Sequence, residues 1–173
     1  MSTTAAVDRV KQELLERVER CCGRLRQLAA SLPETLAELA AAEQLVRSGM
    51  LEIGRELLQG WSDAADGRVE TPECEACADP MRHKGYVEGP LATTLGTLRI
   101  RRARFRCEHC RNEQYPHDAQ LRFLGHAVSW PLAKTTSRLG AQLPFEAARR
   151  SLELDYGVRL SKQTVATIAE EAG

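Results

Sequence analysis

Two cysteine pairs with the spacing C-x-x-C constrain what this chain can fold into more than any other feature of its sequence. Each C-x-x-C forms a tight turn whose two thiolates point the same way, and two such turns supply the four sulfurs of a tetrahedral zinc site. A redox dithiol uses one pair and not two, whereas an iron–sulfur cluster and two disulfides remain as alternatives. We predict one structural zinc ion per chain, because four cysteine ligands leave no open coordination position for catalysis. The predicted ligands are Cys74, Cys77, Cys107 and Cys110.

The first residues of the chain favour a zinc site over disulfides, because they contain no signal for export to an oxidising compartment. "MSTTAAVDRVKQ" has no apolar segment behind a basic one, so no secretory signal is expected, and no apolar run is long enough to span a bilayer. We expect a reducing compartment, the bacterial cytosol or nucleoid, in which cysteines are metal ligands or free thiols. Cys21 and Cys22 are adjacent and cannot share one helix face, so they are expected to be packing residues or free thiols. With four cysteines present, His83 and His109 are expected to be surface histidines and not metal ligands.

Residues 1–64 are predicted to form a helical hairpin. Apolar residues recur at steps of three and four in the first helix, whose predicted inner face consists of Val7, Val10, Leu14, Val18, Cys21, Leu25 and Leu28. Ser31, Pro33 and Glu34 have the pattern of a helix start, with Ser31 as the cap of the second helix. The predicted inner face of that second helix consists of Leu36, Leu39, Val46, Met50, Ile53, Leu57 and Trp61.

A hairpin of two long amphipathic helices needs a further partner, because the helices cannot bury both of their faces against one another. We expect residues 7–61 to meet either the rest of the chain or a second copy of it. In the second case the protein is a homodimer or a higher homo-oligomer.

The middle of the chain is predicted to be a linker, residues 65–72, followed by a four-cysteine zinc ribbon, residues 73–122. Between the cysteine pairs the sequence has the strand–turn–strand pattern of a small antiparallel sheet. Leu98 and Ile100 alternate on one face of the last strand, and Ala103 and Phe105 alternate on the other. We therefore expect a bulge or a strong twist near Arg101–Arg102.

This strand also carries a dense run of arginines on a chain that has no net charge. One alternative is an edge strand whose charges only prevent aggregation. Such a solvated face, however, usually mixes glutamate with arginine. The single sign of the charge favours contact with phosphates, and the residues predicted to bind the DNA backbone are Arg99, Arg101, Arg102, Arg104 and Arg106.

Residues 126–173 are predicted to form a three-helix bundle that contains a helix-turn-helix. Pro144 opens one helix, Gly157 can end it in a left-handed conformation, and Ser161 caps the last helix. A purely structural bundle has a similar outline and remains the alternative. The residues expected to read base edges in the major groove face outward near the start of the last helix: Lys162, Gln163, Thr164 and Thr167.

The sequences "CEACADPMRHKGYVEGPLATTLGTLRIRRARFRCEHCRNEQYP" and "LPFEAARRSLELDYGVRLSKQTVATIAEEAG" resemble the amino-terminal part of ISKra-type insertion-sequence transposases. The resemblance covers about Cys74 to Gly173. It implies a zinc ribbon with the four cysteines named above as ligands, and a DNA-reading helix over Lys162 to Thr167. In that family an RNase H-like domain with a DDE carboxylate triad follows. Gly173 falls where such a domain would begin, so no triad is assigned and no enzyme is expected.

These features predict a mainly α-helical chain with a small β zinc ribbon, in the order helical hairpin, ribbon, helix-turn-helix bundle. The expected function is sequence-specific binding of double-stranded DNA, with dimerisation through the hairpin and no membrane association. The chain would be the front of a transposase or a shortened relative that acts as a regulator. The alternative is an adaptor whose ribbon docks on an acidic partner protein.

Overall fold

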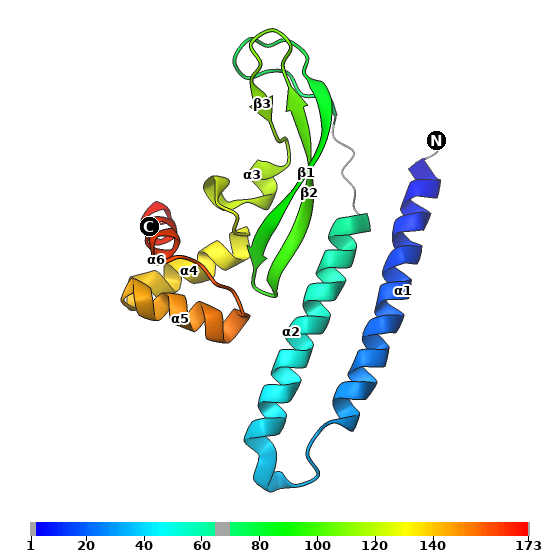
Figure 1. Ribbon diagram of the computed structural model, residues 1–173, viewed down its shortest axis with the longest axis vertical. Coiled ribbons are helices and arrows are strands. Elements are labelled where there is room, and N and C mark those ends of the chain that lie inside the picture. The colour runs from blue at the N-terminus through cyan, green and yellow to red at the C-terminus, as the bar shows by residue number, and fades with distance from the viewer. Residues whose placement is uncertain (1–2, 65–69, 173) are drawn as a thin grey trace. The chain divides into compact units, whose positions relative to one another are not determined.

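The computed structural model describes residues 3–64 and 70–172, and the chain divides after residue 65 into two compact units (Figure 1). The first unit is a pair of helices, and the second contains a sheet of three strands and the remaining helices. The prediction of a mainly helical chain with a small antiparallel sheet is confirmed. Most of the predicted linker, residues 65–69, lies outside the described residues.

The first unit consists of α1 (Thr3–Ala30) and α2 (Leu39–Ala64), joined through the short 3-10 helix η1 (Leu36–Glu38). The predicted cap at Ser31 is wrong, because the hydroxyl of Ser31 donates to the carbonyl of Leu28 at 2.8 Å and so belongs to the end of α1. The second helical segment starts after Thr35, whose extended backbone precedes η1. The Thr35 hydroxyl donates to the Glu38 carboxylate at 2.9 Å, a side-chain pair that the Ser31 pattern did not predict.

The predicted inner faces of the two helices are wrong in part. Of the seven residues expected on the inner face of α2, only Ile53 is buried, and Trp61 is 52% exposed. Small residues make the contact instead: a Cβ atom at Gly60 would lie 2.1 Å from Cδ of Arg17, and one at Gly49 would lie 2.7 Å from Cδ2 of Leu28. The helices approach where their side chains are smallest, and this rotates the larger apolar side chains toward the flanks.

On α1, Cys21 is buried and Cys22 is exposed, and both are free thiols, as predicted. Burial raises the pKa of the Cys21 thiol. Val18 and Leu25, predicted to face inward, are 44% and 39% exposed. The side chains of Val7 and Val10 lie outside the described part of the chain.

The second unit contains the sheet, with the strand order β1 (Arg82–Thr93), β2 (Gly96–Arg106) and β3 (Glu113–Gln114), all antiparallel. The predicted irregularity near Arg101–Arg102 is misplaced. Pairing runs without interruption from Gly96 to Ala103, and the register shifts in the opposite strand, between His83 and Tyr86. Gly85 lies at this shift with a φ of +92°, a conformation that glycine adopts readily.

The apolar side of β2 changes because the two ends of the strand are buried on opposite faces. Leu98 and Ile100 are buried on one face, whereas Ala103 and Phe105 on the other face join the cysteine turns and Met81 in one cluster. The alternation was read correctly from the sequence, but its cause is a change of covering element and not a bulge in β2.

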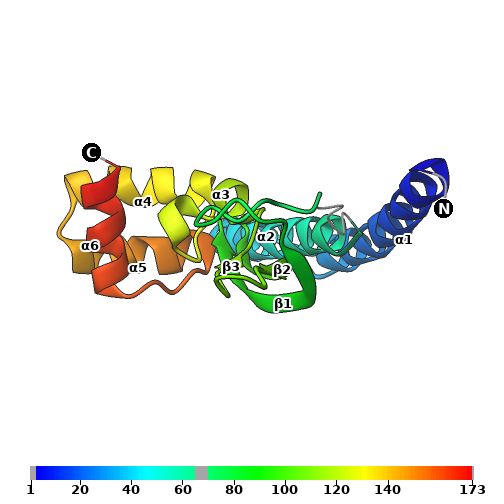
Figure 2. The ribbon, with the colours of Figure 1, turned by 90° about the horizontal axis from the view of Figure 1, so that it is seen from above.

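The remaining helices are α3 (Asp118–Leu121), η2 (Phe123–Gly125), α4 (Trp130–Gln142), α5 (Phe145–Tyr156) and α6 (Lys162–Glu171). The last three pack around one core, whose most deeply buried side chains include Leu132, Leu152, Val165 and Ile168. Ala92 of β1 belongs to the same core, and its backbone hydrogen-bonds to Ala127 and Ser129 at 2.9 and 2.8 Å. The sheet and the helices that follow it are therefore parts of one compact unit (Figure 2).

Candidate metal centre and nucleic-acid surface

Four cysteine side chains from two distant segments meet in the second unit. The Sγ atoms of Cys74, Cys77, Cys107 and Cys110 all lie within 4.8 Å of one another. The Sγ atoms of Cys74 and Cys110 are 3.4 Å apart, and those of Cys77 and Cys107 are 3.5 Å apart. A disulfide requires about 2.05 Å, so the cysteines are free thiols and the two-disulfide alternative does not hold.

The distances between the sulfur atoms fit tetrahedral coordination of a metal ion. A metal–sulfur bond of about 2.3 Å, as in zinc thiolate sites, places the corners of a tetrahedron about 3.8 Å apart. Three of the sulfur–sulfur distances lie between 3.4 and 3.7 Å, close to that value. His109 and His83 do not belong to the cluster, in agreement with the prediction that they are not ligands.

The two cysteine turns have the same backbone geometry. The N–H of Cys74 donates to the carbonyl of Asp79, and the N–H of Cys107 donates to that of Asn112, both at 2.9 Å. The residue directly after each pair, Ala78 or Arg111, has a φ near +60°. Such a conformation is uncommon without glycine, and its repetition at equivalent positions means that both turns hold their thiolates in the same way.

Hydrogen bonds and burial shift the pKa values of Cys74 and Cys77 in opposite directions. The backbone N–H of Ala76 is the main cause that lowers the pKa of Cys74 to about 6. A backbone hydrogen bond at Asp79 lowers the pKa of Cys77, but burial and the neighbouring Cys107 thiol outweigh it and raise that pKa to about 12. Four thiolates at this spacing repel one another, so a cation among them is what would allow all four to ionise.

The five arginines of β2 fall into two groups with different surroundings. Arg102 and Arg104 share a face of the strand and contact acids of the following segment. The Arg102 guanidinium donates to both carboxylate oxygens of Asp118, at 2.8 and 2.6 Å, and its side chain is only 14% exposed. A nitrogen of Arg104 lies 3.7 Å from the Glu113 carboxylate. These two side chains hold the chain after the second cysteine pair against the sheet.

Arg99 and Arg101 lie on the opposite face of the strand and are exposed. The register places them next to Pro90 and Glu88 of β1, and the next residue along this face of β1 is Tyr86. We call the exposed surface formed by His83, Tyr86, Glu88, Arg99 and Arg101 the exposed hairpin face. Arg106 is half-buried at the ribbon end of β2.

The start of α6 presents polar side chains to solvent, as predicted. The hydroxyl of Ser161 accepts a hydrogen bond from the N–H of Thr164 at 3.0 Å, which caps the helix. Gly157 ends α5 with a φ of +63°, also as predicted. Lys162 and Gln163 are exposed, while Thr164 and Thr167 are half-buried.

Two details qualify the predicted base-reading residues of α6. The Thr167 hydroxyl donates to the carbonyl of Gln163 at 3.0 Å, and the Thr164 hydroxyl lies 2.8 Å from that of Ser161. Both threonines therefore have local partners, and Lys162 and Gln163 extend furthest into solvent.

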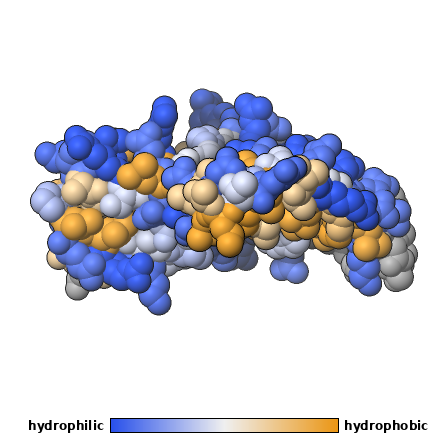
Figure 3. All heavy atoms as spheres, turned by 90° about the horizontal axis from the view of Figure 1, so that it is seen from below, coloured by the Kyte–Doolittle hydropathy of each residue, from blue (hydrophilic) through white to orange (hydrophobic). Residues whose placement is uncertain are grey.

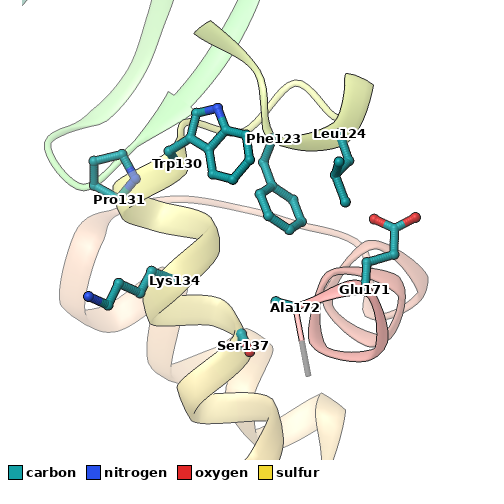
Figure 4. A pocket seen from close by; sticks show the side chains of 8 residues that line it. All are labelled: Phe123, Leu124, Trp130, Pro131, Lys134, Ser137, Glu171 and Ala172. Atoms are coloured by element: carbon teal, nitrogen blue, oxygen red, sulfur yellow. The ribbon is translucent and has the colours of Figure 1, made fainter. Parts of the chain in front are cut away.

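An open groove of about 780 Å³ lies between α4 and the end of α6. Figure 4 shows the Phe123 ring between Trp130 of α4 and the last residues of α6, while Lys134 points away from that ring. Leu124, at the rim, is 57% exposed with a φ of +43°. The sequence predicted helices in this region but not the groove between them.

Asp118 is the functional neighbour that the sequence analysis missed. It accepts from Arg102 and, at 3.3 Å, from Arg122, so one carboxylate joins β2 to the chain leading into the helical bundle. A signal was present, because Arg102 shares a face with the apolar Leu98 and Ile100 and so points toward a buried side of the sheet. An arginine in that position needs an acidic partner.

No protein-family model matches the chain, and no curated protein matches it. Among the residues that the structure describes, no helix combines the length and the apolar character needed to cross a membrane.

Proposed function

We propose that this chain is a zinc-stabilised, dimeric module that binds double-stranded DNA and has no catalytic activity of its own. The observation that carries the proposal is the start of α6. There the capped helix α6 packs one face on the buried core and presents Lys162 and Gln163 to solvent on another. It belongs to the same compact unit as the arginines of β2. In this proposal α5 and α6 form a helix-turn-helix, and α6 enters the major groove.

Zinc is the proposed metal because four thiolates match its preference for soft ligands and tetrahedral geometry. A cysteine-only set with no open position makes the ion structural. Purified protein is expected to contain one zinc per chain by elemental analysis, and Cys107→Ser is expected to lose it. Iron at that stoichiometry, or no metal in the unmodified protein, would overturn the assignment.

DNA is the proposed ligand of α6 because lysine and glutamine are residues that read base edges. The test is selection of binding sites from a library of random duplexes, followed by binding to the selected duplex and to a scrambled one. Gln163→Ala is expected to reduce the preference for the selected duplex by about 1–3 kcal/mol while leaving binding to scrambled duplex unchanged.

Glu170→Ala is the matched control for this test, since Glu170 is exposed near the other end of α6. It is expected to leave the preference unchanged. If no duplex is enriched, or if both variants behave alike, α6 does not read DNA. Retention of the chain by an acidic protein instead would favour the adaptor function.

Dimerisation is proposed for the first unit because its two sides differ in polarity. On one side, ion pairs join the helices: Arg17 with Asp63 at 2.7 Å, and Arg24 with Glu56 at 2.7 Å. Helix geometry places a set of exposed apolar residues from both helices on the opposite side. Among them are Val18, Leu25, Val46, Met50 and Trp61. Figure 3 looks toward the loop that joins α1 to α2 and shows apolar residues gathered in a band on this helix pair.

The proposed partner of this apolar side is a second copy of the chain. Val18 and Leu25 are seven residues apart, as are Leu39 and Val46, which is the repeat of helices that pack lengthwise. Two hairpins that face each other with these sides form a four-helix bundle with a closed, two-fold interface.

Light scattering is expected to give a dimer at tens of micromolar. Val18→Asp with Val46→Asp is expected to give a monomer with unchanged helix content, because both residues are exposed within one copy. Ser48→Asp adds charge to another exposed position of α2, outside the apolar band, and is expected to leave the dimer intact. A monomeric unmodified chain at that concentration would exclude this partner.

The resemblance in the cysteine and helix-turn-helix stretches supports a role as the front of an insertion-sequence transposase or as a regulator derived from one. Reading the open reading frame beyond codon 173 separates the two roles. A downstream carboxylate triad indicates the transposase, and a stop codon indicates the regulator.

A further inference from the structure

The exposed hairpin face contains a stack of planar side chains, and the two rings of this stack take no part in contacts with phosphate. The guanidinium carbon of Arg101 lies 4.0 Å from the centre of the Tyr86 ring. The His83 ring meets Tyr86 edge-on, with 5.0 Å between the ring centres and 71° between the planes. Arg101 and His83 are exposed, and Tyr86 is 40% exposed, so this stack faces solvent.

The stack is fixed to the rigid part of the ribbon. His83 also contacts Phe105 edge-on at 5.2 Å, and Phe105 is 3% exposed in the cluster that contains Cys74 and Cys107. The row Arg101, Tyr86, His83, Phe105 thus runs from solvent to the core beside the cysteine turns. Planar groups that are already ordered lose little conformational entropy when a ligand stacks on them.

Charge alone does not account for this face. A carboxylate oxygen of Glu88 lies 3.6 Å from Nε of Arg99, and Glu88 is also opposite Arg101 in the register. Part of the positive charge is therefore offset, which weakens attraction to phosphate. What distinguishes the face is a solvent-exposed guanidinium and two rings, the combination on which unpaired bases stack.

We infer that the exposed hairpin face binds an unpaired DNA base, which extends the stack that the Arg101 guanidinium forms on the Tyr86 ring. This inference rests on the proposed DNA-binding function and names the form of DNA that the hairpin takes. A base inside a duplex cannot stack there, because its neighbours cover both of its faces. The preferred ligand is therefore a duplex with a frayed or single-stranded segment beside the site that α6 reads.

The test compares the binding of full-length, zinc-loaded protein to three DNA probes: a blunt duplex, the same duplex with a single-stranded overhang, and a thymidine 15-mer. The overhang probe is expected to bind at least fivefold more tightly than the blunt duplex. This corresponds to about 1 kcal/mol, the lower end of the range for one stacked base, since about 1.4 kcal/mol is tenfold in affinity.

Three variants separate stacking from charge and from folding. Tyr86→Leu is expected to abolish the gain from the overhang, whereas Tyr86→Phe retains the ring and the gain. Arg101→Lys retains the charge but loses the planar group, so it is expected to lose most of the gain. Thermal unfolding and zinc content are measured for each variant, and only variants that match the unmodified protein are compared.

The outcomes distinguish this inference from the proposed function. If the blunt duplex binds but the overhang adds nothing, the stacking inference is wrong and DNA binding by α6 stands. If the 15-mer binds and loses affinity on Tyr86→Leu while no duplex binds, the stacking site holds and the role of α6 is wrong. If Tyr86→Leu and Tyr86→Phe lose the gain equally, the ring does not act by stacking and the inference fails.

Discussion

Arg101 and Arg102 are adjacent arginines that the structure assigns to different tasks, and replacing each by alanine tests that assignment. Arg102 makes two charged hydrogen bonds to Asp118 and lies 5.0 Å from the Tyr115 ring centre, with little exposure. A charged hydrogen bond is worth about 1.5–3 kcal/mol, and losing a fully buried pair costs about 3–5 kcal/mol. Because Arg102 and Asp118 are partly exposed, we expect Arg102→Ala to destabilise the second unit by about 2 kcal/mol.

Arg101→Ala is expected to change stability by less than about 1 kcal/mol, since an exposed cation–π contact contributes about that much at most. The assay is thermal unfolding of zinc-loaded protein. A loss of about 2 kcal/mol lowers the midpoint by roughly 10 °C in a domain of this size. In the Arg102→Ala background, Asp118→Asn should cost less than it does alone, because the pair is already broken.

For DNA binding we expect Arg101→Ala to have the larger effect and Arg102→Ala the smaller, the reverse of their effects on stability. Arg101→Ala is expected to flatten the log–log dependence of affinity on salt by about 0.9 if Arg101 contacts one phosphate. Arg102→Ala, measured where it is folded, should leave that slope unchanged. The reasoning is refuted if Arg102→Ala flattens the slope without lowering the unfolding midpoint, because Arg102 would then face DNA and not Asp118.

Two further predictions concern the helices. Gly140→Ala should destabilise the bundle by about 1–3 kcal/mol despite alanine's better helix propensity, because the new Cβ would lie 2.7 Å from the Cβ of Ala169. Gly23→Ala is the control: nothing lies within 4 Å of the added Cβ, so this substitution should increase stability by up to about 1 kcal/mol. Equal effects in chemical denaturation would contradict the packing of α4 on α6. Ser161→Ala should cost about 1 kcal/mol by removing the cap of α6, and Ser161→Asp should restore it; an unchanged midpoint in Ser161→Ala would mean that the cap is not formed.

Local patterns predicted the cysteine cluster and the boundary between α5 and α6. C-x-x-C dictates where two thiolates point, and Pro144, Gly157 and Ser161 act within one turn of the residues they affect. None of these requires knowledge of a distant contact. The structure accordingly places the four cysteines together and ends α5 and begins α6 where expected.

The errors arose where a distant contact decides the outcome. Glycine has a low helix propensity, so Gly49 and Gly60 carry no signal of packing in the sequence, yet they are the positions at which α1 and α2 cross closely. This turns Val46 and Trp61 outward, although their spacing is that of an inner face. Periodicity identifies an apolar stripe but does not say which part of a wide stripe meets the neighbouring helix.

The arginines of β2 show that charge pairing, too, cannot be predicted when the partner lies far away in the sequence. The sequence shows one sign of charge on the strand, whereas the acids that contact Arg102 and Arg104 come from the segment after the second cysteine pair. The pairing of a strand with a later segment depends on the fold of the ribbon. Arg99 and Arg101 lie together on the exposed hairpin face, where Glu88 contacts Arg99.

The most direct measurement of the central claim is the affinity of the zinc-loaded chain for a selected duplex at several salt concentrations, repeated after removal of the metal by a chelator. We expect tight, salt-dependent binding by the loaded protein. After metal removal, affinity should fall at least tenfold and the salt dependence should flatten, because the ribbon that holds Arg99 and Arg101 is built around the cysteine cluster. No duplex binding at tens of micromolar in low salt, or identical isotherms with and without zinc, would contradict it.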